Sequence, residues 1–267
     1  MAELSLTVLG ARGSMPVSGD NYARYGGSTT SFTVTAGQTL LLVDCGTALV
    51  KAADFGVNEW PVFMTHYHFD HIQGLQFFRP FYEEGNSFTF YGHHPEGMSL
   101  QEAIATTFKP PFFPVAVEET QSTKKYVELE EGPLTVGGID ISHARLHHPQ
   151  GVVGYRFSHS GSSIVIASDH EAGDLASDAA LKELADGADI LIHDAQYTPE
   201  DYEPHRGWGH STWEDAVTMA SDAGVRSLVL TSHDPWRTDD QIDDIVERAR
   251  ARFPDVSAAH EGMVITA

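Results

Sequence analysis

Four side chains of metal-binding types lie within six residues in the segment 66–71, which reads His-Tyr-His-Phe-Asp-His. The apolar stretch 61–64 just before it predicts a short buried strand. Because side chains two positions apart on a strand point the same way, His66 and His68 are expected to face one cleft. The aspartate and the last histidine of the motif follow where the chain turns. Imidazole and carboxylate ligands without a thiolate suit Zn²⁺ or a similar divalent ion in an open, catalytic site.

The composition excludes several other classes of protein. The 267 residues contain 16 Lys+Arg against 38 Asp+Glu, a formal net charge of −22, which does not suit a basic nucleic-acid binder. A single cysteine, Cys45, excludes a disulfide framework and a four-cysteine zinc site. The N-terminus shows no signal-peptide pattern and no stretch approaches a membrane span, so we expect a cytoplasmic protein without membrane contacts.

The elements that must position the motif are short strands first and alternating helices and strands later. Their order favours a sheet-rich α/β sandwich that forms one domain over residues 1–267. Ser211 is expected to cap the third helix, with Glu214 completing a capping box. The predicted strands are 4–9, 31–35, 39–43, 61–64, 134–136, 139–146, 152–157, 163–167, 190–192 and 227–230, and the predicted helices are 47–55, 175–185, 212–223 and 239–253.

The stretch 79–126 is less regular than its surroundings. It contains five prolines, three of them in the segment Phe108–Pro114, which cannot be a central strand or a helix interior. We predict an ordered loop or insert, either a lid over the site or a surface loop packed on its own aromatic side chains.

The motif His-x-His-x-Asp-His at a strand end resembles that of the metallo-β-lactamase fold superfamily, and the resemblance covers nearly the whole chain. Asp44-Cys-Gly resembles the Asp-x-Gly element of this superfamily, in which the aspartate supports the ligand loop. The resemblance implies an αββα sandwich and two divalent metal ions, Zn²⁺ in first place, with Mn²⁺ or Fe also compatible. It implies one ion on His66, His68 and His148, a second ion on Asp70, His71 and His233, and a bridging Asp169.

The flanking residues choose a branch of the superfamily. The segments 148–156, 193–196 and 207–212 resemble the third-histidine turn, the His-Glu-Ala-Thr element and the His-Ser-Thr helix start of ribonuclease Z and small phosphodiesterases. Metallo-β-lactamases themselves have a cysteine where this chain has Asp169, and the chain has no appended flavin domain. The long basic, glycine-rich arm with which ribonuclease Z grips tRNA is also missing. The resemblance therefore implies phosphodiester chemistry without a tRNA substrate.

The resemblance also implies roles for individual residues. A hydroxide bridging the two ions is expected to attack phosphorus in line, with His210 as the general acid and Asp194 orienting it. Asp70 is counted with the catalytic residues as well as with the ligands. His148 is preferred over His147 as a ligand because it directly precedes a proline, as in the family turn. The expected substrate contacts are Lys109, Arg206 and His147.

These features predict a metal-dependent hydrolase that cleaves a small phosphodiester of the cyclic nucleotide or cyclic phosphate type. A thioester or lactone hydrolase on the same site is a competing hypothesis, because the same hydroxide attacks carbonyl carbon. Ribonuclease Z-like tRNA processing and a non-catalytic metal-binding accessory protein are two further hypotheses. We expect a small-molecule substrate, no strong nucleic-acid binding, and a monomer or homodimer.

Overall fold

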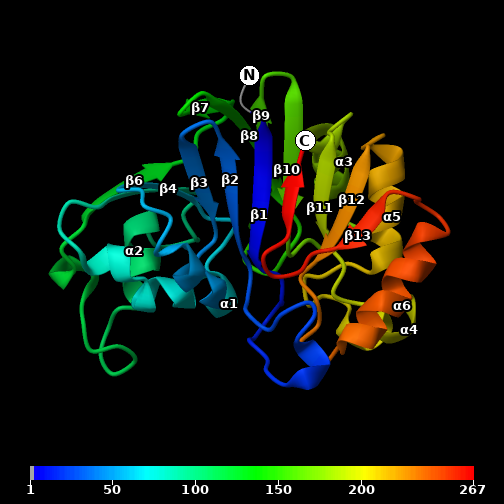
Figure 1. The fold of residues 1–267 in the computed structure, drawn as a ribbon, viewed down its shortest axis with the longest axis horizontal. Coiled ribbons are helices and arrows are strands. Elements are labelled where there is room, and N and C mark those ends of the chain that lie inside the picture. Colours follow the sequence, from blue (N-terminus) through cyan, green and yellow to red (C-terminus); the bar gives the residue numbers. More distant parts are fainter. Residues whose placement is uncertain (1–2) are drawn as a thin grey trace.

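The computed structural model describes residues 3–267 as two seven-stranded sheets packed face to face, with helices on both outer sides (Figure 1). The first sheet contains, in spatial order, β14 (Val264–Thr266), β1 (Leu4–Gly10), β2 (Ser31–Ala36), β3 (Thr39–Val43), β4 (Glu59–Phe63), β5 (Ser87–Gly92) and β6 (Thr123–Glu128). The second contains β13 (Val256–Ala258), β12 (Ser227–Thr231), β11 (Ile190–Asp194), β10 (Ser162–Ala167), β9 (Val152–His159), β8 (Ile139–Leu146) and β7 (Leu134–Val136). The predicted αββα sandwich is confirmed.

The helices belong to two outer layers, each packed on one sheet (Figure 1). The α-helices are α1 (Phe69–Ile72), α2 (Leu100–Thr106), α3 (Leu175–Ala185), α4 (Pro199–Tyr202), α5 (Trp213–Asp222) and α6 (Asp239–Arg250). The 3₁₀ helices are η1 (Asp20–Tyr22), η2 (Thr47–Ala52), η3 (Gln73–Phe77), η4 (Arg79–Tyr82), η5 (Val117–Glu119) and η6 (Glu203–His205). No helix of residues 3–267 is both long enough and apolar enough to cross a membrane.

Three apolar layers hold the sandwich together. Alternate side chains of the two sheets interdigitate in the middle layer, where the rings of Phe63 and Phe157 meet edge to face with centroids 5.6 Å apart. Helices η2 and α2 cover the outer face of the first sheet through an aromatic cluster that includes Trp60, Phe81 and Phe88. Helices α3, α5 and α6 bury the outer face of the second sheet. The scaffold that presents the strand ends is therefore rigid on both sides.

Two predictions about the elements are wrong in detail. Helix α5 is capped by Thr212, whose hydroxyl accepts from the backbone N–H of Asp215, one residue later than predicted. The hydroxyl of Ser211 is used elsewhere, since it donates to the carbonyl of His170 at 2.6 Å. The predicted helix 47–55 is shorter, because only Thr47–Ala52 are helical, and they form the 3₁₀ helix η2.

The stretch 79–126 is not a separate insert, because it supplies two strands of the first sheet. Strand β5 pairs in parallel with β4, and β6 pairs in parallel with β5. Phe88 and Phe90 alternate with half-buried neighbours and are fully buried under the helical layer. Helix α2 is capped by Ser99 and Glu102. The predicted loop is restricted to the proline-rich residues between α2 and η5, in which Phe108 is buried and Phe112 is exposed.

Glycine is required where the Asp-x-Gly element passes the metal-binding motif. A Cβ atom at Gly46 would lie 2.4 Å from the carbonyl oxygen of Thr30 and 2.5 Å from that of Asp70. The neighbouring Cys45 N–H donates to the carbonyl of His71 at 2.7 Å. The two segments are therefore locked together backbone to backbone, and any side chain at position 46 would separate them.

We expect Gly46→Ala to lower the free energy of unfolding by about 2–3 kcal/mol, because both clashing atoms belong to the backbone and cannot move aside easily. Gly85→Ala is the matched control: its site has φ +89° but no atom within 4 Å, so only the backbone strain of about 1 kcal/mol applies. Urea unfolding of both variants measures the difference. Equal losses in the two variants would contradict the close approach.

Candidate metal centre

Six strands from both sheets bring their ends to one edge of the sandwich, and the candidate site lies there. The first sheet contributes the residues just after β3 and β4, and the second contributes those at the ends of β8, β10, β11 and β12. Three of these residues are non-glycine residues with left-handed backbone conformations, namely Asp44 (φ 59°), Asp169 (φ 57°) and Ser232 (φ 58°). Such residues are uncommon and cluster at functional sites, where surrounding contacts hold them.

Three imidazoles converge on one point. The Nδ1 atom of His68 lies 3.0 Å from Nε2 of His66 and 3.1 Å from Nε2 of His148. Three nitrogens bound to one tetrahedral Zn²⁺ would lie about 3.3 Å apart, which fits this spacing. Burial lowers the pKa of His148 to about 4 and that of His66 well below its usual value, so both rings are neutral, the form that binds metals.

A second group of ligand atoms, which includes Asp169, adjoins the first. The Nε2 atom of His71 lies 3.2 Å from Oδ2 of Asp169 and 3.3 Å from Oδ2 of Asp70. Oδ2 of Asp169 also lies 3.8 Å from Nε2 of His66. His210 joins His148 and Asp169 in a further set of ligand atoms that lie within 4.8 Å of one another. Asp169 therefore belongs to two of the three groups of atoms that could hold a metal, one with His66 and His71 and one with His148 and His210.

The other nitrogen of each of these rings is engaged by an oxygen atom, as is usual for histidines that bind metals. This contact orients each ring and sets the nitrogen that faces the cluster. The pairs are His66 Nδ1 with Thr65 Oγ1 at 3.1 Å, His68 Nε2 with Gln150 Oε1 at 3.0 Å, His71 Nδ1 with Asp44 Oδ2 at 2.8 Å, His148 Nδ1 with the Gly209 carbonyl at 2.7 Å, and His210 Nδ1 with Asp194 Oδ2 at 2.7 Å.

The electrostatics of the cluster suit a cation. Burial disfavours the charged ring of His71, but Asp169, Asp70 and Asp44 outweigh it and raise the His71 pKa well above its usual value. The pKa of Asp169 is lowered against its own burial by His71 and then His210. Buried carboxylates thus hold protons on neighbouring imidazoles, and a divalent cation would replace those protons. The donor set and its electrostatics fit a metal centre.

The structure does not bring His233 to the cluster, contrary to the prediction. Its Nε2 donates to the carbonyl of Ala259 at 2.9 Å, and its ring meets Tyr25 edge to face. The preceding residue, Ser232, points to the site instead and donates to Oδ1 of Asp169 at 3.0 Å. Adjacent residues at a strand end face opposite ways, so the side chain of His233 points away from the cluster when that of Ser232 points to it.

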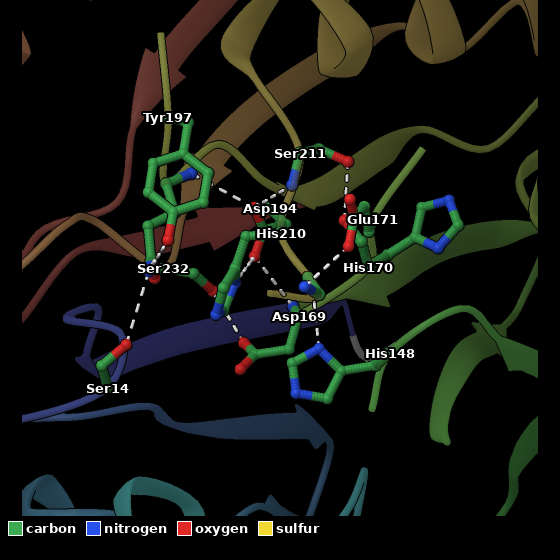
Figure 2. Close-up of polar contacts among 12 residues, drawn as sticks. Ser14, His148, Asp169, His170, Glu171, Asp194, Tyr197, His210, Ser211 and Ser232 are labelled. Carbon is green, nitrogen blue, oxygen red and sulfur yellow. Dashed lines mark hydrogen bonds and ion pairs between the residues drawn. The ribbon is translucent and has the colours of Figure 1, made fainter. Parts of the chain in front are cut away.

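His210 lies inside the cluster and not at its rim. Its side chain is buried, and Figure 2 shows it between Asp194 and Asp169. Burial opposes the charged ring, but Asp194 and Asp169 raise the His210 pKa to about 9. His210, the predicted general acid, is thus among the potential ligands. The predicted orienting contact from Asp194 is present, and Asp194 also accepts from the backbone N–H of Ser211 at 2.9 Å.

The predicted substrate contacts do not face the cluster. His147 is exposed, and its Nδ1 donates to the carbonyl of Glu171 at 3.2 Å. Arg206 pairs with Glu203 at 2.8 Å on the surface. Lys109 is exposed at the start of the loop after α2. None of the three lines the cleft that contains His68, Asp70, Asp169 and His210.

Glu171 is a site residue that sequence reasoning did not assign, although it lies two residues after Asp169. Its carboxylate accepts from the backbone N–H groups of Gly207 and Gly209 and from the hydroxyl of Tyr202, each at 2.7 Å. Figure 2 shows Glu171 beside the loop that leads to His210. Because the carbonyl of Gly209 orients His148, Glu171 positions two candidate ligands through one loop. The signal available in the sequence was that Glu171 is an acidic residue only two positions after Asp169, an aspartate at the end of a strand.

Comparisons with known proteins find a family and several relatives. The family described as "Beta-lactamase superfamily domain" matches residues 39–233. A Ribonuclease Z of Haloarcula marismortui is 24% identical over 323 residues, covering 97% of this chain and 96% of that protein. The probable metallo-hydrolase YhfI of Bacillus subtilis is 25% identical over 239 residues, covering 85% and 86% of the two chains. The crystal structure of YhfI has a TM-score of 0.75 at 23% identity and covers both chains completely.

The fold and the His/Asp cluster define a metal-dependent hydrolase of the metallo-β-lactamase fold. The chain belongs to the β-lactamase superfamily. A diphosphatase of the PhnP family has the same fold, with a TM-score of 0.72 at 22% identity over 98% of this chain and 97% of that one.

We expect His210→Ala to lose bound metal, whereas His233→Ala should keep it. The two histidines are both buried, but only His210 has a nitrogen beside Asp169. His233→Ala should lower the melting temperature instead, because it removes a buried ring and leaves the Ala259 carbonyl without its donor. Elemental analysis of both purified variants checks this. Full metal content in His210→Ala together with loss in His233→Ala would make His233 the ligand and His210 a bystander.

Glu171→Ala should weaken metal affinity by about 10- to 100-fold with little change in overall fold, because the loop that orients His148 and His210 loses its acceptor. Competition with a chromophoric chelator measures the affinity. Glu203→Ala is the control, since Glu203 lies in the same loop region but pairs only with Arg206 on the surface. Equal affinities in wild type and Glu171→Ala would show that the loop keeps its position without this carboxylate.

Proposed function

We propose that this chain is a dinuclear-metal phosphodiesterase that cleaves a small phosphodiester. The observation that carries the proposal is the position of Asp169, whose carboxylate is common to two adjoining sets of imidazole and carboxylate ligands. One ion would be held by His66, His68 and His148, and the second by Asp70, His71 and His210, with Asp169 shared. Zn²⁺ suits the nitrogen-rich set best, and Mn²⁺ or Fe is also compatible with it.

Two divalent ions bound there would supply a nucleophilic water at neutral pH and neutralise charge on a phosphoryl oxygen. The protein supplies the positioning. Thr65 donates twice to Asp44, which holds the Nδ1 proton of His71 and so aims its Nε2 at Asp70 and Asp169. Asp70 is fixed in turn by the backbone N–H of Ser14 at 2.8 Å.

A cleft of about 410 Å³ above the cluster is the proposed place of the scissile group. Ser14, Phe69, Gln196 and Trp208 line it together with the candidate ligands. Gln196 is buried, and its Oε1 has no hydrogen-bond partner within residues 3–267. Phe69 and Trp208 are largely exposed and offer flat apolar surfaces to a base or an aromatic group.

The net charge and the length of the chain both favour a small substrate. A net charge of −22 opposes long-range attraction of a polyanion such as tRNA. The alignment with the Haloarcula Ribonuclease Z spans 323 residues, more than the 267 of this chain, so that relative carries segments without a counterpart here. A small phosphodiester, such as a cyclic nucleotide or a cyclic phosphate, fits both observations.

Cleavage of precursor tRNA is the second candidate function, because several relatives carry the name Ribonuclease Z. One of them, from Brevibacillus brevis, is 36% identical, but only over 105 residues, which is 38% of this chain and 31% of that protein. The higher identity is therefore confined to part of both chains. This candidate requires cationic contacts along the nucleic acid, which a salt series detects.

We expect the protein reconstituted with Zn²⁺ or Mn²⁺ to hydrolyse bis(p-nitrophenyl) phosphate, with a rate that depends weakly on salt up to about 0.15 M. Precursor tRNA should be cleaved only at background level. Asp169→Ala should abolish hydrolysis and lose metal, while the exposed acid Asp222, paired with Lys182 on the surface at the end of α5, serves as the control Asp222→Ala. Efficient, steeply salt-dependent cleavage of precursor tRNA would favour the second candidate.

A further inference from the structure

A second cavity of about 260 Å³ opens beside the metal-binding motif and shares His68 with the cleft above the cluster. Residues from the loop after β5 form one wall, and the turn between β8 and β9 forms the other. Its lining is largely apolar, with Pro95, Met98 and Pro149. A substrate whose scissile group lies at the cluster can therefore place another part of itself in this cavity.

Arg145 is the one cation among the residues that line this cavity. It lies on the face of β8 that buries Ile139 and Ile141 between the sheets, because alternate strand residues share a face. At position 145 the sandwich opens, so the side chain reaches solvent at the mouth of the cavity. A charged residue is unusual in a row of residues that faces the space between the sheets. The alternation of residue types along the sequence of this strand already marked Arg145 as such an exception.

Among residues 3–267, the guanidinium of Arg145 has no protein partner. Its side chain makes no ion pair and no hydrogen bond with any of residues 3–267, although acids outnumber bases more than twofold in this chain. Other arginines close to the site are occupied: Arg206 pairs with Glu203 and Arg237 with Asp201, at 2.8 and 2.7 Å. The carboxylate of the nearby Glu128 accepts from the backbone N–H of Leu100 and does not pair with Arg145. Arg145 is therefore free to bind an anion.

Two imidazoles stand beside this arginine. The rings of His93 and His143 lie 5.3 Å apart, and burial followed by the charge of Arg145 lowers the His93 pKa to about 4. His93 is thus neutral and can donate one hydrogen bond while adding no charge of its own. His93 and Arg145 both line the cavity, and hydrogen-bond donors of these two kinds suit a carboxylate or a phosphate.

We infer that this cavity binds the part of the substrate that is not cleaved, and that Arg145 holds a second anionic group there. This inference rests on the proposed phosphodiesterase function, since it assumes that the scissile phosphodiester lies at the metal-binding cluster. The substrate class is a phosphodiester that carries an additional phosphate or carboxylate, with an apolar portion against Met98 and Pro149. Arg145 is then a specificity-determining residue.

Two esters with the same scissile bond test the inference in the metal-loaded protein: p-nitrophenyl phenyl phosphate and its analogue with a carboxylate on the phenyl ring. The wild type should favour the carboxylated ester in kcat/KM by about 10- to 100-fold, mainly through KM, as expected for hydrogen bonds to a charged group. Arg145→Gln should remove this preference, and Arg145→Lys should keep part of it. Lys125→Gln is the matched control, because Lys125 is also exposed and has no side-chain partner in the described part of the chain, but lines a different groove.

Binding of a probe that cannot be hydrolysed separates this inference from the proposed function. Diphenylphosphinate and its carboxylated analogue are titrated into wild type and Arg145→Gln by calorimetry. Hydrolysis of both esters without preference, or equal binding of the two phosphinates, overturns the inference and leaves the phosphodiesterase proposal intact. Tighter binding of the carboxylated phosphinate that depends on Arg145, with neither ester hydrolysed, overturns the proposed function and supports the anion site.

Discussion

The arrangement of the site depends on one buried carboxylate, that of Asp44. It accepts from the backbone N–H and the hydroxyl of Thr65, at 2.8 and 2.7 Å, and from Nδ1 of His71 at 2.8 Å. These contacts join the end of β3 to the end of β4 and to helix α1, so the motif leaves its strand in one direction only. Burial raises the Asp44 pKa, and the donors around it oppose that shift. Without this carboxylate, the His71 ring would be free to turn away from the cluster.

The second sheet meets this arrangement from the opposite side. Parallel strands β10, β11 and β12 end at the same edge, and each supplies one oxygen-bearing side chain, from Asp169, Asp194 and Ser232. Asp169 and Ser232 have left-handed backbones, which turns their side chains towards the neighbouring sheet. The candidate centre therefore lies between two rigid sheets, and Asp169 belongs to two of the three candidate groups of ligands.

Charge is distributed unevenly around this interface. Many of the basic side chains form ion pairs or donate hydrogen bonds to backbone carbonyls. Arg156, for example, donates to the carbonyls of Leu184 and Asp186. Buried carboxylates, those of Asp44, Asp70, Asp169 and Asp194, lie at the cluster, where a metal cation is favoured. Arg145 has no partner within residues 3–267 and lines the cavity beside the cluster. Cation and anion recognition thus lie side by side, which is the electrostatic pattern that a phosphate ester with a further negative charge would meet.

The sequence by itself determined the sandwich and much of the cluster. Alternating apolar residues predicted the strands, and the spacing of ligand types in 66–71 marked the site, because both signals are local. The resemblance did not determine where the side chains at positions 210 and 233 lie, because each depends on which way the chain turns as it leaves a strand or enters a helix. Only the tertiary structure showed that His210 enters the cluster while Ser232, and not His233, reaches Asp169. Only the tertiary structure also showed that Glu171 accepts hydrogen bonds from the loop before His210, and that Arg145 has no partner within residues 3–267. Contacts between residues distant in sequence arise only when the two sheets pack together.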